Sequence, residues 1–242
     1  MENKKNNLSF TIILFFVSAA FFAFSQIFMH ATSSAPWDKS LFDIFSVNIL
    51  DRSLARPYHH LLHKISDLTC ALDLVVLPLA ILIFSTVKSK RKTFTFFTLL
   101  LVYATCIFFS KGIYDFIKST VERIRPYMYF ENPSPKGILN GDFQHSFPSG
   151  HTCNACLGAA FFTATLVFYK KNLSLKKQSH LVPFLIALAY LIAAVTGALR
   201  IISGNHFFTD VIVGALLGSF EGYAVTLLNQ KFLFKDLFKD SL

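Results

Sequence analysis

The stretch His145-Ser146-Phe147-Pro148-Ser149-Gly150-His151 lies between a polar loop and a long apolar run. Pro, Ser and Gly suit the first turn of a helix, and they place the last His within that turn. The start of a helix carries backbone N–H groups without intrahelical partners, together with the positive end of the helix dipole. The stretch therefore predicts a site for an anion such as phosphate at the beginning of a long helix.

The composition is that of a membrane protein. Of the 242 residues, 53% are hydrophobic and 29 are Phe, more than a soluble domain of this size can hide from water. Only 15% are charged, and these cluster between apolar runs, as in loops that connect membrane spans. The net charge of +9 also suits nucleic-acid binding. Because the Lys residues flank the apolar runs and form no basic face, we predict no nucleic-acid partner.

Six apolar runs approach the length that a helix needs to cross a bilayer, about 20 residues. We therefore predict an all-α polytopic bundle of six transmembrane helices, which forms one integral-membrane domain over residues 1–242. The first run is longer than the core of a usual signal peptide, so we expect it to be retained. The predicted spans are 10–29, 68–87, one that starts at 94 and continues past 110, 150–169, 181–199 and about 207–228.

The segment before the second span shows apolar residues near helical period with charges between them. This pattern predicts one or two amphipathic helices on the membrane surface, around residues 38–65. His59, His60 and His63 in this segment suggest either a metal cluster or a solvated, interfacial face. We favour the second interpretation and predict no metal site.

The distribution of Lys and Arg predicts the orientation of the bundle. With six spans, the N-terminus, 88–92, 170–180 and the C-terminal tail lie on one side of the membrane, and they hold most of the excess Lys. By the positive-inside rule this side is the cytoplasm. The opposite side receives residues 30–67, 119–149 and 200–209, so the stretch quoted first lies at this side.

Three patches meet on that opposite side, residues 118–126, 148–151 and 200–210, and the first and third carry Lys or Arg. Lys118 and Arg125 are seven residues apart, so two turns of a continuous helix would point both to one side. Arg200 adds a third cation. Guanidinium groups match phosphate oxygens in a planar fork, and an ammonium group acts as a point charge. Ser149 and the amides around Gly150 can add neutral donors.

Two His residues complete a set of groups suited to phosphoryl transfer. His206 and Asp210 are spaced i, i+4, so the carboxylate can accept from one ring nitrogen and leave the other as a nucleophile. His151 at its helix start can act as a general acid. Such chemistry needs positioning and charge stabilisation most of all, and this set requires no metal.

Two further patterns keep more than one interpretation. Lys111, Asp115, Lys118 and Glu122 share one helix face, which forms either an interfacial ion-pair ladder or a wall of the site. Cys153-Asn154-Ala155-Cys156 has the C-x-x-C spacing of redox and metal pairs. No second Cys/His pair accompanies it, so we predict two small buried thiols.

These motifs resemble the type 2 phosphatidic-acid phosphatase family, or lipid phosphate phosphatases, which share a fold with vanadium haloperoxidases and bacterial acid phosphatases. The family pattern is K-x6-R-P, P-S-G-H and S-R-x5-H-x3-D, and the resemblance covers about residues 68–228. Lys118 to Pro126 and Pro148 to His151 match the first two parts. Arg200, His206 and Asp210 match the third, whereas Leu199 replaces its Ser. In the family that Ser is expected to donate a hydrogen bond to the phosphate, so Leu199 removes one donor. The loss of a hydrogen bond to a charged group costs about 1.5–3 kcal/mol.

The resemblance implies a role for each matched residue. His206 would attack phosphorus and form a phosphohistidine, Asp210 would orient it, and His151 would protonate the leaving oxygen and then activate water. No metal or other cofactor is implied. The residues expected to hold the phosphate oxygens are Lys118, Arg125, Ser149, Gly150 and Arg200.

The predicted protein is a multi-pass enzyme of a bacterial inner (plasma) membrane, with its active site facing the periplasm or exterior. Its partners are membrane lipids and a lipid phosphate substrate. We rank lipid A phosphate and undecaprenyl diphosphate above phosphatidylglycerophosphate and phosphatidic acid. A phosphotransferase that uses a second lipid as acceptor, and a non-catalytic lipid transporter on the same scaffold, stay open as alternatives.

Overall fold

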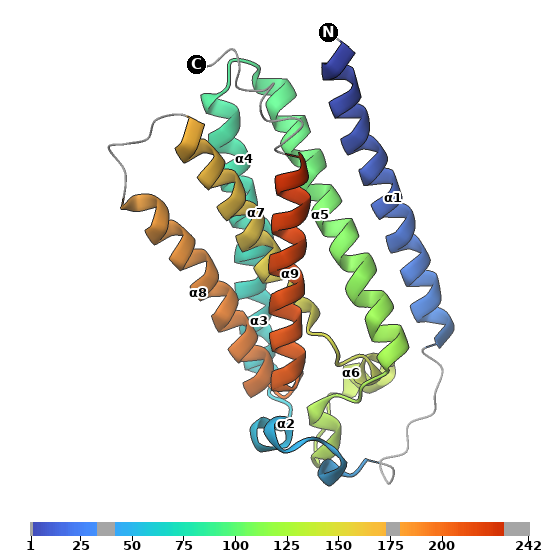
Figure 1. The fold of residues 1–242 in the computed structure, drawn as a ribbon. Helices are drawn as coiled ribbons and strands as arrows, with labels where there is room; N and C mark the ends of the chain where they lie inside the picture. The colour runs from blue at the N-terminus through green and yellow to red at the C-terminus, as the bar shows by residue number, and fades with distance from the viewer. Residues whose placement is uncertain (1, 33–41, 173–179, 230–242) are drawn as a thin grey trace.

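The computed structural model describes residues 2–32, 42–172 and 180–229, and these residues form a bundle of long helices (Figure 1). Six helical stretches are long and apolar enough to cross a membrane, which confirms the predicted all-α architecture. The long helices are α1 (Glu2–Thr32), α3 (His60–Ala71) continued by α4 (Leu77–Lys88), α5 (Lys92–Val121), α7 (Gly150–Asn172), α8 (Leu181–Ile202) and α9 (Phe208–Asn229).

The second span differs from its prediction at its beginning. A π-helical turn, η3 (Leu72–Val76), joins α3 to α4, so one continuous helical span runs from His60 to Lys88. The prediction of surface helices up to residue 65 is therefore wrong for residues 60–65. Before them lie only η2 (Ile44–Ser46) and α2 (Ile49–Leu54), while residues 38–41 lie outside the described part. Helix α3 packs on α8, where the buried Ser66 accepts from Arg200, so residues 60–65 begin the second span although His60 and Lys64 are exposed.

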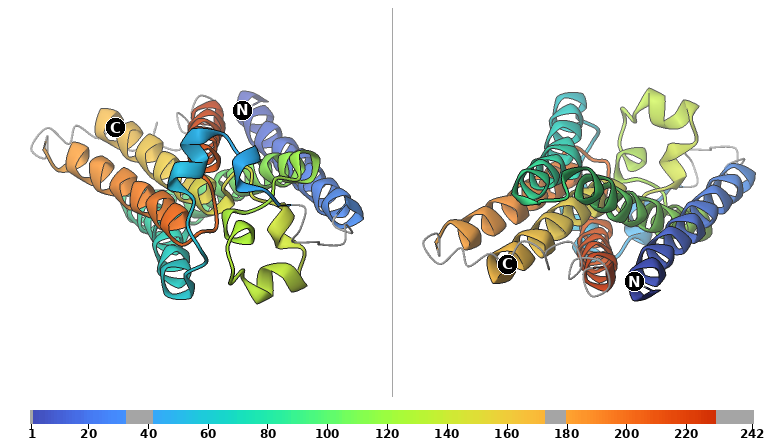
Figure 2. Two further views of the ribbon diagram at one scale, coloured as in Figure 1. Left: turned by 90° about the horizontal axis from the view of Figure 1, so that it is seen from below. Right: turned by 90° about the horizontal axis from the view of Figure 1, so that it is seen from above.

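Helix α7 is the central element of the bundle. In its most apolar window 83% of the residues are buried, against 11% in α1. Figure 2, seen along the bundle, shows α1 at the rim beside α5. The stretch that contains His151 therefore begins the most enclosed helix of the molecule.

Close packing of α7 against α9 depends on three glycines of α9. A Cβ atom on Gly218 would lie 2.0 Å from the backbone oxygen of Cys153. Similar additions at Gly214 and Gly222 would lie 2.5 and 2.8 Å from the backbone oxygens of Ser149 and Leu157. Small residues at this spacing let two membrane helices approach backbone to backbone.

Short helices gather at one end of the bundle, where α5 ends and α7 and α9 begin (Figure 1). Besides α2, they are η4 (Pro126–Tyr129), α6 (Pro135–Leu139) and η5 (Asp142–Gln144). All three sequence patches that carry the predicted chemistry reach this end. The start of α1 and the end of α9 lie at the other end (Figure 1). The Lys residues of the tail, and Lys176 and Lys177, fall outside the described residues.

Candidate active site

A cavity of about 290 Å³ opens where α3, α5 and α7 meet the turn between α8 and α9. Four of its side chains are cations and two are carboxylates, so the cavity carries a positive charge that complements a phosphate dianion. Its lining residues are His63, Lys111, Tyr114, Asp115, Lys118, Arg125, Asp142, Gly150, His151, Asn154, Arg200 and His206.

His206 lies in the turn between α8 and α9 and is 1% exposed. Its Nδ1 lies 2.7 Å from the backbone oxygen of Ser146. A carbonyl oxygen only accepts, so Nδ1 must carry the proton and donate it. The lone pair of Nε2 then faces the cavity, where Nη1 of Arg125 donates to it at 3.1 Å. Nε2 is therefore the nucleophilic atom of this ring.

Asp210 lies behind His206, but it is not the acceptor that the sequence predicted. Its Oδ2 is 3.7 Å from Nδ1 of His206, and the Ser146 carbonyl takes the hydrogen bond instead. Oδ2 accepts from the Ser146 hydroxyl at 2.6 Å and from the amide of Phe207 at 2.8 Å. The carboxylate thus holds the two segments on either side of the imidazole ring, and orients that ring through Ser146.

Arg123 connects this carboxylate to the short helix α2. It pairs with Asp210 at 2.5 Å and with Asp51 at 2.7 Å. Asp51 also accepts from the amide and the hydroxyl of Thr209 in the first turn of α9. Burial would raise the pKa of Asp51, but these hydrogen bonds from Thr209 and Arg123 hold it below its usual value. Asp51 is therefore a charged anchor for the beginning of α9.

His151 is the second residue of α7 and faces the cavity with a side chain that is 36% exposed. Its Nε2 lies 3.0 Å from Oδ1 of Asp67 on α3. The hydropathy pattern does not single out Asp67, because the apolar run of the second span starts only at residue 68. The i, i+4 spacing of His63 and Asp67 at the beginning of an apolar run was the available signal.

The three predicted phosphate-binding cations all line the cavity and are at most 8% exposed. Lys118 donates to the backbone oxygen of His145 at 2.9 Å. Arg125 pairs with Asp142 at 2.8 Å. Arg200 donates from Nη1 to His63 and to the Ser66 hydroxyl, whereas its Nε has no partner in the structure. Buried donors with few carboxylate partners are suited to hold an anion.

Lys118 and Arg125 come together by a different route from the predicted one. Helix α5 ends at Val121, and Glu122 caps it with a left-handed φ of 45°. The two cations therefore do not share a helix face. Arg125 precedes η4, and the turn after α5 carries its guanidinium back towards Lys118. Lys111 and Asp115 line the cavity together with Lys118, so this part of the helix face forms a wall of the site. Nζ of Lys111 lies 3.8 Å from Oδ2 of Asp115.

The two neutral phosphate binders differ in position. Gly150 lines the cavity, and a Cβ atom there would lie 3.3 Å from the ring of Tyr114. Ser149 is fully buried, and its hydroxyl lies 2.9 Å from that of Thr152 instead of lining the cavity. Leu199, at 9% exposure, is also outside the described lining.

Two groups outside the membrane spans have shifted pKa values that fit anion chemistry. Burial lowers the pKa of His206 well below its usual value, and the nearby cations Arg125, Arg200 and Lys118 lower it further. The ring is therefore neutral at neutral pH. Burial would raise the pKa of Asp142, but Arg125 and Lys118 hold it far below its usual range. Asp142 stays charged and fixes Arg125 in the cavity.

The two cysteines of the C-x-x-C motif are part of the interior of the bundle. Cys153 and Cys156 are buried free thiols, as predicted. Within the described ranges 2–32, 42–172 and 180–229, no group of three or more His, Cys, Asp or Glu residues is arranged to hold a metal ion.

Comparison with known proteins gives three matches. The model of the PAP2 superfamily matches residues 97–234. Phosphatidylglycerophosphatase B of Bacillus subtilis (strain 168) is 31% identical over 156 residues, which cover 64% of this chain and 68% of that protein. The crystal structure of a transmembrane PAP2-type phosphatidylglycerolphosphate phosphatase from Bacillus subtilis is 23% identical. It aligns over 96% of this chain and 98% of that chain, with a TM-score of 0.48.

Proposed function

This chain belongs to the PAP2 superfamily and is a membrane lipid phosphatase, and we propose that it releases phosphate through a phosphohistidine at His206. The observation that supports this proposal is the ring of His206. Its Nδ1 donates to a backbone oxygen, so Nε2 presents a lone pair to a cavity lined by buried cations.

The first step joins Nε2 of His206 to phosphorus. The ester bond between phosphorus and the lipid oxygen breaks, and that oxygen takes a proton from His151. In the second step His151 accepts a proton from water, whose oxygen attacks phosphorus and releases the imidazole with inorganic phosphate. Lys118, Arg125 and Arg200 stabilise the charge on the phosphoryl oxygens in both steps.

Asp67 is a positioning residue for His151 in this mechanism. Its carboxylate accepts from Nε2 at 3.0 Å, so it fixes the orientation of the imidazole ring that must donate to the leaving oxygen. Asp210 positions His206 through Ser146, as described above. Leu199 does not line the cavity, so the absence of the family Ser is compatible with catalysis.

We propose phosphatidylglycerophosphate as the substrate, on the strength of the 31% identical relative that acts on it by name. Lipid A phosphate and undecaprenyl diphosphate, preferred from the sequence, stay predictions without a matching relative. We also propose that the active-site end of the bundle faces the exterior or periplasm of a bacterial plasma membrane, because the Lys- and Arg-rich loop 88–92 between α4 and α5 lies at the other end.

The test is phosphate release by detergent-solubilised protein from four lipids: phosphatidylglycerophosphate, phosphatidic acid, undecaprenyl diphosphate and lipid A. The variant His206→Ala should lose activity by at least about a thousandfold, since removal of a nucleophile leaves only the binding contribution. His180→Ala, an exposed His at the far end of α8, is the matched control. Full activity of His206→Ala would reject the mechanism. Lipid binding without phosphate release would support the transporter alternative.

A further inference from the structure

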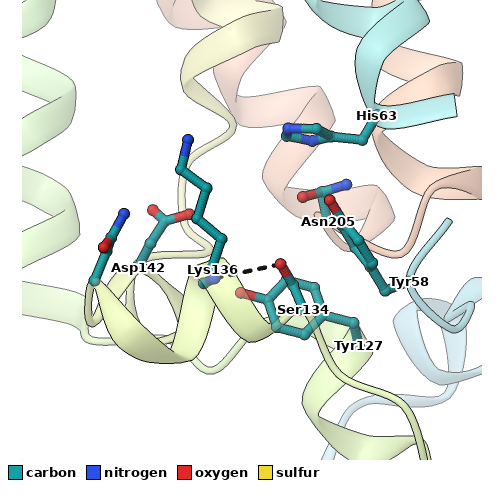
Figure 3. Close-up of a pocket in the computed structure, with 9 residues that line it drawn as sticks. Tyr58, His63, Tyr127, Ser134, Lys136, Asp142 and Asn205 are labelled. Atoms are coloured by element: carbon teal, nitrogen blue, oxygen red, sulfur yellow. Dashed lines mark hydrogen bonds between the residues drawn. The ribbon is translucent and has the colours of Figure 1, made fainter. Parts of the chain in front are cut away.

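A second cavity, of about 170 Å³, adjoins the catalytic one beside α6 (Figure 3). We call it the α6 cavity. It shares two wall residues, His63 and Asp142, with the catalytic cavity, so the two spaces are neighbours. The α6 cavity is lined by Tyr58, His63, Tyr127, Ser134, Lys136, Gly137, Asn140, Asp142 and Asn205.

Tyr127 brings an unsatisfied donor to this cavity. Its side chain is 1% exposed, and its hydroxyl has no hydrogen-bond partner in the structure. A buried hydroxyl without a partner is costly, so such a group indicates a ligand or water at this place. Two neighbours fix its position. The ring packs edge-on against Tyr58 at 5.7 Å, and a Cβ atom on Gly137 would lie only 2.1 Å from the hydroxyl oxygen.

Lys136 brings a cation to the same cavity. Figure 3 shows Lys136 and Asp142 along one side of the cavity, with Tyr58 and Asn205 facing them and His63 above. The carboxylate of Asp142 is already paired with Arg125 at 2.8 Å. In the part of the chain that the structure describes, no ion pair neutralises Lys136. The lining thus offers an incoming group an exposed ammonium group without an ion pair and a buried hydroxyl without a hydrogen-bond partner among the described residues.

We propose that the α6 cavity binds a second phosphate oxyanion, held by Lys136 and Tyr127, next to the phosphate that reacts. The inference rests on the proposed function. Phosphate oxygens accept hydrogen bonds from an ammonium group and a phenol hydroxyl. Their negative charge also balances the positive charge of Lys136, which no carboxylate in the described residues pairs with. The ring of His63 lies 6.4 Å from that of His151, so a group that leaves past His151 continues towards this cavity.

This oxyanion has two sources. One is a phosphodiester in the headgroup of the lipid, as in phosphatidylglycerophosphate, which lies beyond the leaving oxygen. The other is the inorganic phosphate product on its way out. A lipid with a single phosphate, such as phosphatidic acid, supplies only the second source.

Kinetics on two lipids distinguishes these sources. The variants are Lys136→Gln and Tyr127→Phe, with Lys90→Gln and Tyr223→Phe as matched controls outside the cavity. If the headgroup binds, the KM for phosphatidylglycerophosphate rises about tenfold relative to that for phosphatidic acid. If free phosphate binds, its inhibition constant rises by a similar factor with both lipids. Variants that change neither quantity overturn the proposal.

A binding measurement separates this proposal from the proposed function. Inorganic phosphate is titrated into full-length His206→Ala protein and followed by ³¹P NMR. Two phosphate sites are expected. One of them should be absent from the double variants in which Lys136→Gln or Tyr127→Phe is combined with His206→Ala. A titration that neither substitution alters overturns the second site, whether or not the wild-type protein hydrolyses lipids.

Discussion

The reactivity of His206 depends on hydrogen bonds that reach it from other segments. A backbone oxygen is an acceptor that pH does not titrate, so Ser146 keeps the proton on Nδ1 over a wide range of pH. Arg125 approaches Nε2 from the cavity side, and phosphate oxygens would take over this donor when substrate binds. The same cations that bind substrate thus keep the ring neutral.

We predict that His206 stays unprotonated where an ordinary His titrates. Its pKa is lowered by burial and by Arg125 and Arg200, so the proton is bound only at a pH below the usual midpoint of about 6.5. NMR of ¹³C-labelled His should show one resonance, absent from His206→Ala, that does not shift between pH 8 and about 6.5. A midpoint near 6.5 for that resonance would contradict the assignment.

Asp67 offers a second prediction for a single residue. Without the carboxylate, the ring of His151 is less well oriented towards the leaving oxygen, so Asp67→Asn should lower kcat on lipid substrates by about 10- to 100-fold. An aryl phosphate with an acidic phenol needs little protonation, and its turnover should fall much less. Asp43→Asn, an exposed carboxylate, serves as the control. Equal losses on both substrates would assign Asp67 a purely structural role.

At the scale of elements, the packing of α7 against α9 positions the residues of the site. Helix α7 carries Gly150 and His151 in its first turn, and α9 carries Asp210 in its first turn. The amide of Ser149 donates to the backbone oxygen of Asp210 at 3.0 Å, which joins the two helix starts directly. The glycines of α9 allow this approach, because any side chain there would push the helices apart.

Gly218 gives the prediction at this scale. A methyl group would lie 2.0 Å from the backbone oxygen of Cys153, so Gly218→Ala should destabilise the fold by about 1–3 kcal/mol and reduce activity with it. Thermal inactivation in detergent is the measurement. Leu216→Ala, on the lipid-facing side of the same helix at 66% exposure, should have a much smaller effect. Equal stability of Gly218→Ala would show that the two helices can separate freely.

For the whole molecule, the orientation in the membrane decides which lipids reach the site. Asn132, in the segment between η4 and α6, is exposed at the active-site end, and Lys90 is exposed in the loop between α4 and α5. The four native cysteines are buried, so they interfere little with labelling. An impermeant maleimide should label Asn132→Cys in intact cells and Lys90→Cys only after lysis. The reverse pattern would place the site on the cytoplasmic side.

The amino-acid sequence by itself determined the six spans and the three motifs that meet at one end. Both are local properties, since a helix that crosses the bilayer needs an apolar run of sufficient length and motif spacing places the catalytic groups at the ends of these runs. The sequence also identified His206, His151 and the cations Lys118, Arg125 and Arg200 as candidate site residues, and all five line one cavity.

Only the tertiary structure decided how these groups are held. The acceptor for His206 is a backbone oxygen 60 residues away, which no side-chain pattern can reveal. Asp67 reaches His151 because the second span begins earlier than its hydrophobicity indicates. The α6 cavity arises from a polar segment with little periodicity, folded back beneath the helix ends. Contacts between distant segments depend on packing of the whole bundle, and that packing is what converts separate motifs into one site.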